Sequence, residues 1–398
     1  MSTETSYKPK EQCMSAKSVL FSLLRAAVCG EAITEETKRA CTPDTLKAIY
    51  TIAKRHDLTH LVWYAVSGLG LPESKPLVKC KYAAMQALMY YMQLNSTYEQ
   101  LCKTLEDGCI PFIPLKGSVL RNYYPEPWLR TSCDIDILVN EDTLDAVANL
   151  LVEKLNYIRK EKTDHDIPMF APNGVHLELH YRTINESRQP KAHAVLEDIW
   201  CKATPVAPKR FHYCMSDEML YSYHIAHMAK HFRNGGCGIR PFLDLWILNH
   251  RVEHDQNKRK SLLSQCELLT FAQAAEKLSE VWFSDAQKDT LSEQMEHFIL
   301  YGGAYGNLPN YLSVQQAKKG GKLQCILSKV FLPYDTLKSH YPILQKNRWL
   351  TPVYEVRRWI RLIFTKDIKR SIHTLKVNAD ISAEQLSSAT ELLKALGL

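Results

Sequence analysis

Residues 134–139 read Asp-Ile-Asp-Ile-Leu-Val, an alternation of acidic and aliphatic side chains that is typical of a β-strand. Successive side chains of a strand point to opposite faces, so Asp134 and Asp136 should share one face, with their Cα atoms ~7 Å apart. Two ionised carboxylates on one face repel each other, and a hard cation such as Mg²⁺ or Mn²⁺ relieves that repulsion. On these six residues alone, a polar strand edge with two solvated acids is the simpler interpretation.

A third acid, Glu178, lies in a second alternating stretch, His-Leu-Glu-Leu-His at residues 176–180. Leu177 and Leu179 should point to one face, and Glu178 with its two flanking histidines to the other. On a strand adjacent to residues 134–139, Glu178 could complete a metal-binding triad with the two aspartates. It could instead be the general base that deprotonates an incoming hydroxyl.

The turn formed by Lys116, Gly117 and Ser118 contains groups that suit a phosphate. An apolar, strand-like segment ends in Gly-Ser before a helix-like run, so the backbone can approach an anion closely and the first helical amides can bind it. The Ser118 hydroxyl would assist, and Lys116 would add a positive charge. A Gly-Ser pair alone is a weak signal, and Lys116 is equally well explained as a solvated loop residue or the partner of a backbone carbonyl.

The remaining pattern predicts the elements that hold these residues. Helical periodicity dominates residues 15–105 and returns from residue 215 onward. Between these regions the strand-like stretches alternate with a helical one at residues 141–155, and residues 110–115 read as an irregular segment or an edge strand because they contain two prolines. We therefore predict an α+β fold with a small mixed β-sheet core between helical regions, and a division into residues 1–105, 106–214 and 215–398.

Composition limits the class of protein. Hydrophobic residues make up 45% and charged residues 23% of the 398 residues, which excludes a wholly disordered chain. The 12 cysteines include no pair at C-x-x-C spacing, which favours reduced, buried thiols over a disulfide framework or a zinc ribbon. No apolar run reaches the ~20 residues that span a bilayer, and residues 1–12 lack the order of a secretory signal. We expect a cytoplasmic protein without a transmembrane segment.

Positive charge is concentrated near the C-terminal end. The chain has a formal net charge of +7, and residues 318–370 contain 13 Lys and Arg against 3 Asp and Glu. Within this region, residues 353–364 have the pattern of a basic amphipathic helix. Its basic side is consistent with a solvated face, with binding of a phosphate-rich acceptor such as RNA, or with docking on an anionic membrane surface.

Taken together, the Gly-Ser pair, the Asp-x-Asp strand and the later acid resemble the polymerase-β-like nucleotidyltransferase superfamily. Residues 115–117 (Leu-Lys-Gly) and 124–130 (Tyr-Pro-Glu-Pro-Trp-Leu-Arg) are similar to one branch of it, the uncharacterised bacterial nucleotidyltransferases of the NTP-transferase-5 type. The last strand of that branch usually reads Asp-Leu-His-Trp-Arg, and residues 178–182 read Glu-Leu-His-Tyr-Arg here. The resemblance extends over residues 18–365.

The resemblance implies a role for each of these residues. Asp134 and Asp136 would bind the metal, Mg²⁺ or Mn²⁺, that grips the triphosphate, and Glu178 would share a second metal or activate the acceptor hydroxyl. Phosphate oxygens would be held by the nucleotide-binding residues Lys116, Gly117, Ser118 and Arg130. Arg130 could instead form a salt bridge to one of the acids.

The resemblance also includes His-Met-Ala-Lys-His at residues 227–231 and the pair Arg240 and Asp244. His227, Arg240 and Asp244 would line a nucleotide or acceptor pocket; alternatively the histidines pack in the interior and Asp244 holds Arg240 in place. The implied activity is transfer of a nucleoside monophosphate from an NTP to an acceptor that the sequence leaves open, whether small molecule, protein or RNA. Phosphoryl transfer in the same pocket and nucleotide binding without catalysis are the alternatives.

Overall fold

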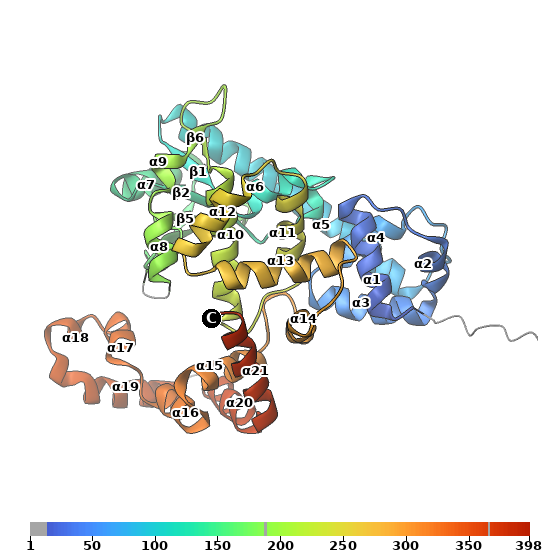
Figure 1. Ribbon diagram of the computed structural model, residues 1–398. Coiled ribbons are helices and arrows are strands. Elements are labelled where there is room, and N and C mark those ends of the chain that lie inside the picture. The colour runs from blue at the N-terminus through green and yellow to red at the C-terminus, as the bar shows by residue number, and fades with distance from the viewer. Residues whose placement is uncertain (1–13, 187–188, 365–366) are drawn as a thin grey trace, which may run out of the picture. The chain divides into compact units, whose positions relative to one another are not determined.

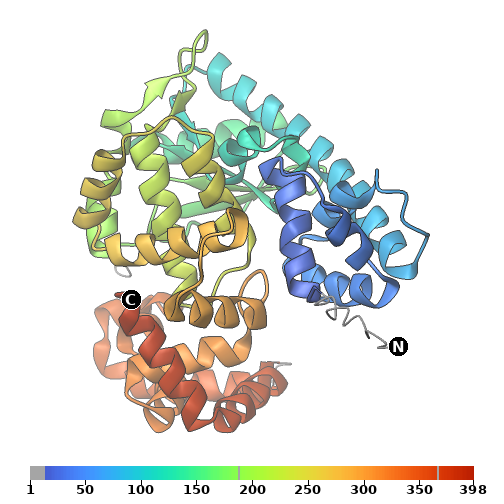
Figure 2. The same cartoon turned by 45° about the vertical axis from the view of Figure 1, so that its right-hand side comes forward.

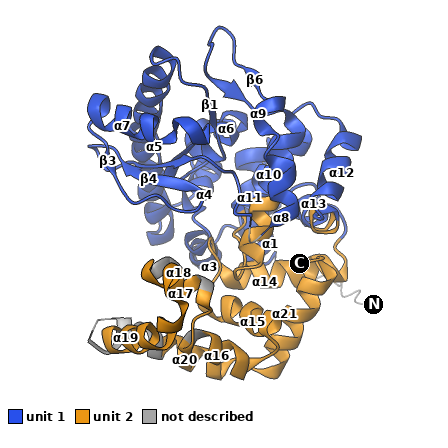
Figure 3. Cartoon of the chain, turned by 90° about the vertical axis from the view of Figure 1, so that its left-hand side faces the viewer, with its two compact units in different colours: residues 1–224, 240–269, 275–287 blue, residues 225–239, 270–274, 288–398 orange. Residues whose placement is uncertain are grey.

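The computed structural model describes residues 14–186, 189–364 and 367–398. Contacts between residues divide the chain into two compact units, which Figure 3 shows in two colours. The first unit comprises residues 1–224, 240–269 and 275–287, and the second comprises residues 225–239, 270–274 and 288–398. Both β-sheets and the three acids belong to the first unit.

The first unit begins with helices, drawn in blue to cyan in Figure 1: α1 (Ala16–Leu24), α2 (Glu35–Ala40), α3 (Pro43–Arg55), α4 (Thr59–Val66) and α5 (Lys75–Asp107). Local sequence explains α3. The hydroxyl of Thr42 accepts a hydrogen bond from the Thr45 N–H at 3.3 Å, and the proline that follows Thr42 suits the first helical turn. Leu46, Ile49 and Ala53 recur at helical spacing, and all three are buried.

The helix α5 is 33 residues long, and its two halves have different surroundings. The first half leaves Met85 and Met89 exposed. The second half contributes Leu94, Leu101 and Leu105 to the hydrophobic core beneath the main sheet. The second half of α5 therefore helps to support the sheet that carries the acids.

The main sheet has the strand order β1–β2–β5–β4–β3, with β1 at Phe112–Pro114, β2 at Asp134–Val139, β3 at Ile158–Arg159, β4 at Asp166–Phe170 and β5 at His176–His180. The strands β2 and β5 are parallel, and the other neighbouring pairs are antiparallel. A parallel pair requires a crossover connection, and the helix α7 (Leu144–Leu155) with the β3–β4 hairpin provides it. The strand β1 lies at the edge of this sheet, as its prolines predict.

The two faces of the main sheet differ in chemistry. Ile135, Ile137, Leu177 and Leu179 form one face, are fully buried, and pack in a core with apolar residues of α5 and α7. A shift of one residue in register would turn these side chains out of the core, so their burial fixes the register. The same register turns the acidic side chains of β2 and β5 to the opposite face.

The other elements of the first unit lie between the strands of the main sheet or after them in the sequence. The short helix α6 (Gly117–Leu120) lies between β1 and β2. After β5 come α8 (Pro190–Leu196), α9 (Ile199–Lys202) and a two-stranded sheet of β6 (Thr204–Pro205) and β7 (Tyr213–Cys214). They are followed by α10 (Asp217–Phe232), α11 (Arg240–His250), α12 (Gln256–Gln265) and α13 (Leu269–Phe283), of which α10 from residue 225 and residues 270–274 of α13 belong to the second unit.

The second unit is built of helices, which run from orange to red in Figure 2: α14 (Thr290–Gly302), α15 (Leu308–Lys319), α16 (Lys322–Val330), α17 (Tyr334–His340), α18 (Ile343–Lys346), α19 (Thr351–Phe364), α20 (Asp367–Asp380) and α21 (Ala383–Ala395). The helix α19 contains the basic segment. Val353 and Val356 on its apolar side are about half exposed, whereas the guanidinium of Arg358 turns toward Glu355. The three interpretations of this helix stay open.

These observations confirm the predicted fold class, an α+β fold with a small mixed sheet and helical regions before and after it. Among the described helices, none combines the length and the apolar character needed to cross a membrane. No disulfide joins cysteines of the described residues, but Cys109, Cys133 and Cys201 are exposed. The expectation of buried thiols therefore holds for only part of them, because Cys109 lies in the turn after α5 and Cys133 in the loop before β2.

Candidate active site

The polar face of the main sheet brings the three predicted acids onto neighbouring strands. The register pairs Asp136 with Glu178 and Asp134 with His176 across the parallel strands β2 and β5. Since β-strand side chains alternate, all four of these side chains lie on the face opposite the hydrophobic core.

Asp136 is the centre of a buried network of charges. Its Oδ1 accepts hydrogen bonds from Lys116 Nζ at 2.7 Å and from His180 Nε2 at 2.9 Å. The same two nitrogen atoms lie 3.8 Å and 3.2 Å from Glu178 Oε2. The side chains of Asp136 and His180 are each 2% exposed, so their charges interact with little screening by water.

These contacts set the protonation of the network. Burial alone would raise the pKa of Asp136, but Lys116 and His180 outweigh it and hold that pKa well below its usual range. The hydrogen bond from His180 lowers the pKa of Glu178. Burial opposes a charge on Lys116 and on His180, yet the neighbouring acids raise the pKa of both.

Asp134 differs from the other two acids. Burial raises its pKa to about 6, and the negative charge of Asp136 contributes further, against the opposing effect of Lys116. Burial is thus the main reason why Asp134 is harder to ionise than the other two acids, and the charge of Asp136 adds to it. Two groups of side chains in it have ligand atoms within 4.8 Å of one another, Asp134–His176–Glu178 and Asp136–Glu178–His180. Glu178 belongs to both groups.

The turn before α6 has an unusual backbone. Lys116 has φ 43° and ψ −115°, a region that residues with a Cβ rarely adopt. A Cβ added to Gly117 would lie 2.9 Å from Arg130 Nη1 and 2.9 Å from Ser132 Cβ. Glycine is therefore needed here because the loop leading to β2 packs directly on the turn.

Ser118 is buried in this turn. Its N–H donates a hydrogen bond to the Leu115 carbonyl at 3.2 Å, so this amide already has a partner within the turn. Its hydroxyl, in contrast, has no hydrogen-bond partner within the part of the chain that the structure describes. The expected phosphate contact of Ser118 thus depends on its hydroxyl.

The structure pairs Arg130 with Asp244. Arg130 Nη2 lies 2.8 Å from Asp244 Oδ2, and Arg130 Nε lies 3.2 Å from Oδ1. Tyr124 donates a third hydrogen bond to Oδ1 at 2.8 Å. This bidentate pairing joins α11 to the loop before β2. The side chain of Asp244 is 0% exposed.

Arg240 and His227 have other partners. Arg240 Nη1 donates to the carbonyl and the hydroxyl oxygen of Thr131, both at 2.7 Å. Asp244 therefore binds Arg130 rather than Arg240, and both side chains of α11 hold the loop that leads into Asp134. His227 belongs to the second unit, where its ring lies 4.5 Å from that of His231. Its contact with a nucleotide stays a prediction.

His180 belongs to the site, although its sequence context predicts no role for it. The alternation in residues 176–180 put it on the same face as Glu178, and a histidine two residues from an acid on that face was the available signal. The sequence did not indicate that its Nε2 would contact both Asp136 and Glu178.

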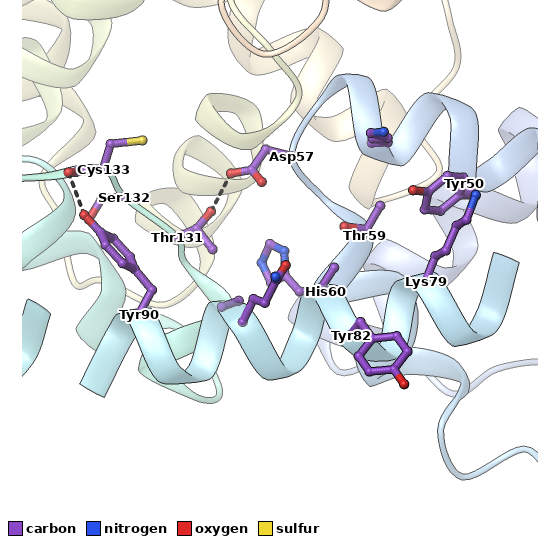
Figure 4. A pocket seen from close by; sticks show the side chains of 14 residues that line it. Tyr50, Asp57, Thr59, His60, Lys79, Tyr82, Tyr90, Thr131, Ser132 and Cys133 are labelled. Atoms are coloured by element: carbon purple, nitrogen blue, oxygen red, sulfur yellow. Dashed lines mark hydrogen bonds between the residues drawn. The ribbon is translucent and has the colours of Figure 1, made fainter. Parts of the chain in front are cut away.

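A cavity of about 640 Å³ in the first unit opens beside the loop before β2, and Figure 4 shows its lining. Tyr90 donates a hydrogen bond to the Cys133 carbonyl at 2.9 Å, and Thr131 donates one to Asp57 at 3.0 Å. The wall also includes Tyr50, Lys54, Lys79 and Tyr82. Cys133 in its wall directly precedes Asp134 in the sequence, but the wall does not include the three acids.

A family model matches this chain. Residues 43–284 match the model of a family described as uncharacterised nucleotidyltransferase, which covers more than half of the chain and includes the acids, the turn and the Arg130–Asp244 pair. Neither the curated proteins nor the solved structures gave a match. With this extent of matching, the chain belongs to that uncharacterised nucleotidyltransferase family.

Proposed function

We propose that this chain is a metal-dependent nucleotidyltransferase that moves a nucleoside monophosphate from an NTP to an acceptor. The observation that carries the proposal is the pairing of Asp136 with Glu178 across parallel strands, with Asp134 on the same face. Such a cluster of carboxylates suits metal-assisted displacement at a phosphate. Membership of the family supports the same class of chemistry.

The residues present fit a hard divalent cation, Mg²⁺ or Mn²⁺. Asp134, Asp136 and Glu178 offer carboxylate oxygens, which are the donors that such ions prefer. Burial, and after it the charge of Asp136, raises the pKa of Asp134 to about 6, and a bound cation would favour the ionised form of this carboxylate. When bound, the ion would neutralise charge on the triphosphate and polarise the phosphate under attack.

Lys116 supplies part of the positive charge in the protein itself. Its ammonium group lies 2.7 Å from Asp136 and 3.8 Å from Glu178. Its flexible side chain can exchange these acids for a phosphate oxygen when the triphosphate arrives. The buried hydroxyl of Ser118, two residues away, can donate a second hydrogen bond to the same phosphate group.

We assign Glu178 to take up the proton of the acceptor because its side chain is more exposed than that of Asp136. Its pKa is lowered by the hydrogen bond from His180, so it is ionised at neutral pH. Its side chain is 24% exposed, against 2% for Asp136, so an incoming hydroxyl can reach it. As the acceptor oxygen bonds to the α-phosphorus, its proton passes to Glu178 and pyrophosphate leaves.

We infer that Arg130, Arg240 and Asp244 support this chemistry indirectly. Arg130 already uses two of its nitrogen atoms on Asp244, and Arg240 uses one on Thr131. Both contacts fix the loop that ends at Asp134. We therefore assign these three residues to positioning the acidic strand rather than to contact with the nucleotide.

The test follows labelled phosphate. Purified protein with Mg²⁺ and cell extract is incubated with NTPs labelled at the α- or the γ-phosphate, and the mixture is separated into protein, RNA and small molecules. Nucleotidyl transfer moves the α label to the acceptor and releases the γ label in pyrophosphate. Phosphoryl transfer would move the γ label instead. The fraction that gains label identifies the class of acceptor.

A matched pair of variants controls this experiment. Asp136→Asn should abolish transfer, whereas Glu153→Gln, which removes an exposed acid of α7, should transfer label at the wild-type rate. Transfer by Asp136→Asn at the wild-type rate would contradict the proposal. If Mg²⁺ and an NTP raise the melting temperature while neither label leaves the nucleotide, the chain is a nucleotide-binding protein without catalysis.

A further inference from the structure

We propose that His165, Asp166 and His180 form a second metal site, which shares His180 with the acid cluster and is suited to Zn²⁺ or a similar transition-metal ion. One ligand atom of each residue lies within 4.8 Å of the corresponding atoms of the other two. Imidazole nitrogen together with carboxylate oxygen favours Zn²⁺ and its neighbours over Mg²⁺. The site does not depend on whether the chain transfers nucleotides.

The backbone holds the three residues together before any ion arrives. Asp166 and His180 are paired in the antiparallel ladder of β4 and β5, so their side chains are neighbours on one face of the sheet. The Tyr181 N–H donates a hydrogen bond to the His165 carbonyl at 3.0 Å, which ties the start of β4 to the end of β5. A site on paired strands is better positioned than one on free loops.

One ring nitrogen of His165 contacts Asp164, and the other is directed to Asp166. Its Nδ1 lies 2.6 Å from Asp164 Oδ1, and its Nε2 lies 3.7 Å from Asp166 Oδ2. A carboxylate on the far nitrogen is the usual arrangement behind a metal-binding histidine, because it fixes the tautomer and the direction of the ring. Here it leaves Nε2 as the ligand atom.

Asp166 is arranged in the same way. The Thr163 hydroxyl bonds to its Oδ1, and the Asp166 N–H bonds back to Thr163 Oγ1 at 3.2 Å. The other oxygen, Oδ2, is the one that faces His165. The side chain is 6% exposed, so this oxygen is held in the interior.

His180 provides the strongest observation. Its Nε2 is used by Asp136 and Glu178 on the β2 side, and its ring is 2% exposed. Its Nδ1 is buried and has no hydrogen-bond partner among residues 14–186, 189–364 and 367–398. A buried polar atom without a partner is costly, and the His165 ring is only 5.7 Å away between centroids. An ion on Nδ1 would satisfy this atom.

Such an ion would also act on the first site. Replacing the Nδ1 proton by a metal leaves the Nε2–H of His180 directed at Asp136 and Glu178. It would fix the imidazole ring and, through it, the positions of the two acids. Three protein ligands leave a fourth position of a tetrahedral ion for water.

The test measures metal binding without nucleotide or Mg²⁺. Full-length protein stripped with EDTA and dialysed is titrated with Co²⁺, whose visible absorption reports its ligands, and then with Zn²⁺ in competition. We expect one strongly bound equivalent without the sulfur-to-cobalt charge-transfer absorption that the exposed cysteines would give. His165→Gln should weaken binding more than about 100-fold, since even outer partners of a metal site contribute 10–100-fold. The matched control His297→Gln, which removes an exposed histidine of α14, should bind like the wild type.

Two further variants separate this site from the acid cluster. Asp166→Asn should weaken binding as His165→Gln does, while Asp134→Asn should leave the cobalt spectrum unchanged; circular dichroism shows that each variant is folded. The proposal is overturned if His165→Gln and Asp166→Asn bind like the wild type, if Asp134→Asn removes the signal, or if the spectrum is that of a thiolate site. None of these readouts uses nucleotidyl transfer, so a failure of the proposed function would leave them unaffected.

Discussion

Two aspartates of the first unit, Asp136 and Asp244, look alike at first sight. Their side chains are 2% and 0% exposed, and each is paired with a long cationic side chain 2.7–2.8 Å away, Lys116 for one and Arg130 for the other. In both, burial alone would raise the pKa, and the paired cation brings it below its usual value. Each is a buried ion pair inside a folded unit.

The surroundings of the two aspartates differ. Both oxygens of Asp244 are used by the rigid fork of Arg130, with Tyr124 as a third donor, so its charge is balanced within the pair. Lys116 is a flexible point charge that Asp136 shares with Glu178. The comparison teaches that an acid whose two oxygens are both used by one cation belongs to the scaffold, whereas an acid that shares its cation with a second acid is suited to a substrate or an ion.

Asp136→Asn should have the largest effect on activity. Removing this charge should lower nucleotidyl transfer by at least about 10²–10³-fold, the usual loss when one preorganised electrostatic group of an active site is removed. The rate of α-label transfer measures it. Asp244→Asn is the comparison: any loss of rate at 25 °C should follow its folded fraction. Equal losses per folded molecule in the two variants would remove the distinction drawn between the two pairs.

Asp244→Asn should have the largest effect on stability. It leaves Arg130 buried without its counter-charge, and breaking a buried pair in this way costs about 3–5 kcal/mol. Urea unfolding followed by circular dichroism gives the free energy of unfolding. Glu153→Gln serves as the exposed control, with a change within about 0.5 kcal/mol. A loss below about 1 kcal/mol for Asp244→Asn would mean that the Arg130–Asp244 pair does not stabilise the fold.

The same variant has a defined pH dependence. The pKa of Asp244 is lower in the folded protein than in the unfolded chain, where it is near ~3.9. As pH falls, the unfolded chain therefore binds the proton first, and the stabilisation from this carboxylate, complete above about pH 5, is lost toward the folded pKa. The difference in stability between the wild type and Asp244→Asn should shrink over that range.

The sequence predicted the acidic face because alternation is a local property. The period of two in residues 134–139 and 176–180 determines which side chains share a face, whatever the strands pair with. The structure adds that β2 and β5 are neighbours in parallel register, with Asp136 opposite Glu178. That pairing depends on a crossover through α7 and the β3–β4 hairpin, which local patterns do not specify.

The partners of the charged residues could not be predicted in the same way. Arg130 and Asp244 are 114 residues apart in the sequence, and nothing near either of them identifies the other. Likewise, the alternation located His180 on the polar face but did not indicate that its Nε2 bridges two acids. Such pairs depend on how elements distant in sequence pack, and this packing is determined by the whole core.

Asp134→Asn should raise stability, whereas Asp244→Asn should lower it. The folded pKa of Asp134 is about 6, above its unfolded value, so its ionisation opposes folding as pH rises. In EDTA, the variant should be more stable than the wild type by about 1–2 kcal/mol above pH 6, after allowance for partial exposure, and the gain should vanish below about pH 4. Urea unfolding at both pH values measures it. A loss of stability at pH 8 would show that ionised Asp134 does not oppose folding.

Tyr124→Phe should have a smaller effect on stability, and the effect should be confined to the Arg130–Asp244 pair. It removes the third hydrogen bond to Asp244 and leaves the Arg130 fork intact, so the expected loss is about 0.5–1.5 kcal/mol of unfolding free energy. Binding of Mg²⁺ and an NTP, followed by the shift in melting temperature, should be unchanged. A weaker shift in this variant would show that the Arg130–Asp244 pair takes part in nucleotide binding.

Ser118→Ala, in the turn that carries Lys116, is the counterpart of Tyr124→Phe at the Arg130–Asp244 pair. Its effect on stability should be the smallest. The Ser118 hydroxyl is buried without a partner in the described part of the chain, so its removal should change the unfolding free energy by no more than about 0.5 kcal/mol, or raise it. If the hydroxyl binds a phosphate, affinity for an NTP with Mg²⁺ should fall about 3–10-fold, the equivalent of one hydrogen bond. Calorimetric titration measures the affinity. An unaltered affinity would take Ser118 out of the phosphate site. The opposite behaviour of the two variants, stability lost in one and ligand binding in the other, would then distinguish a hydrogen bond that completes the scaffold from a hydroxyl kept for a substrate.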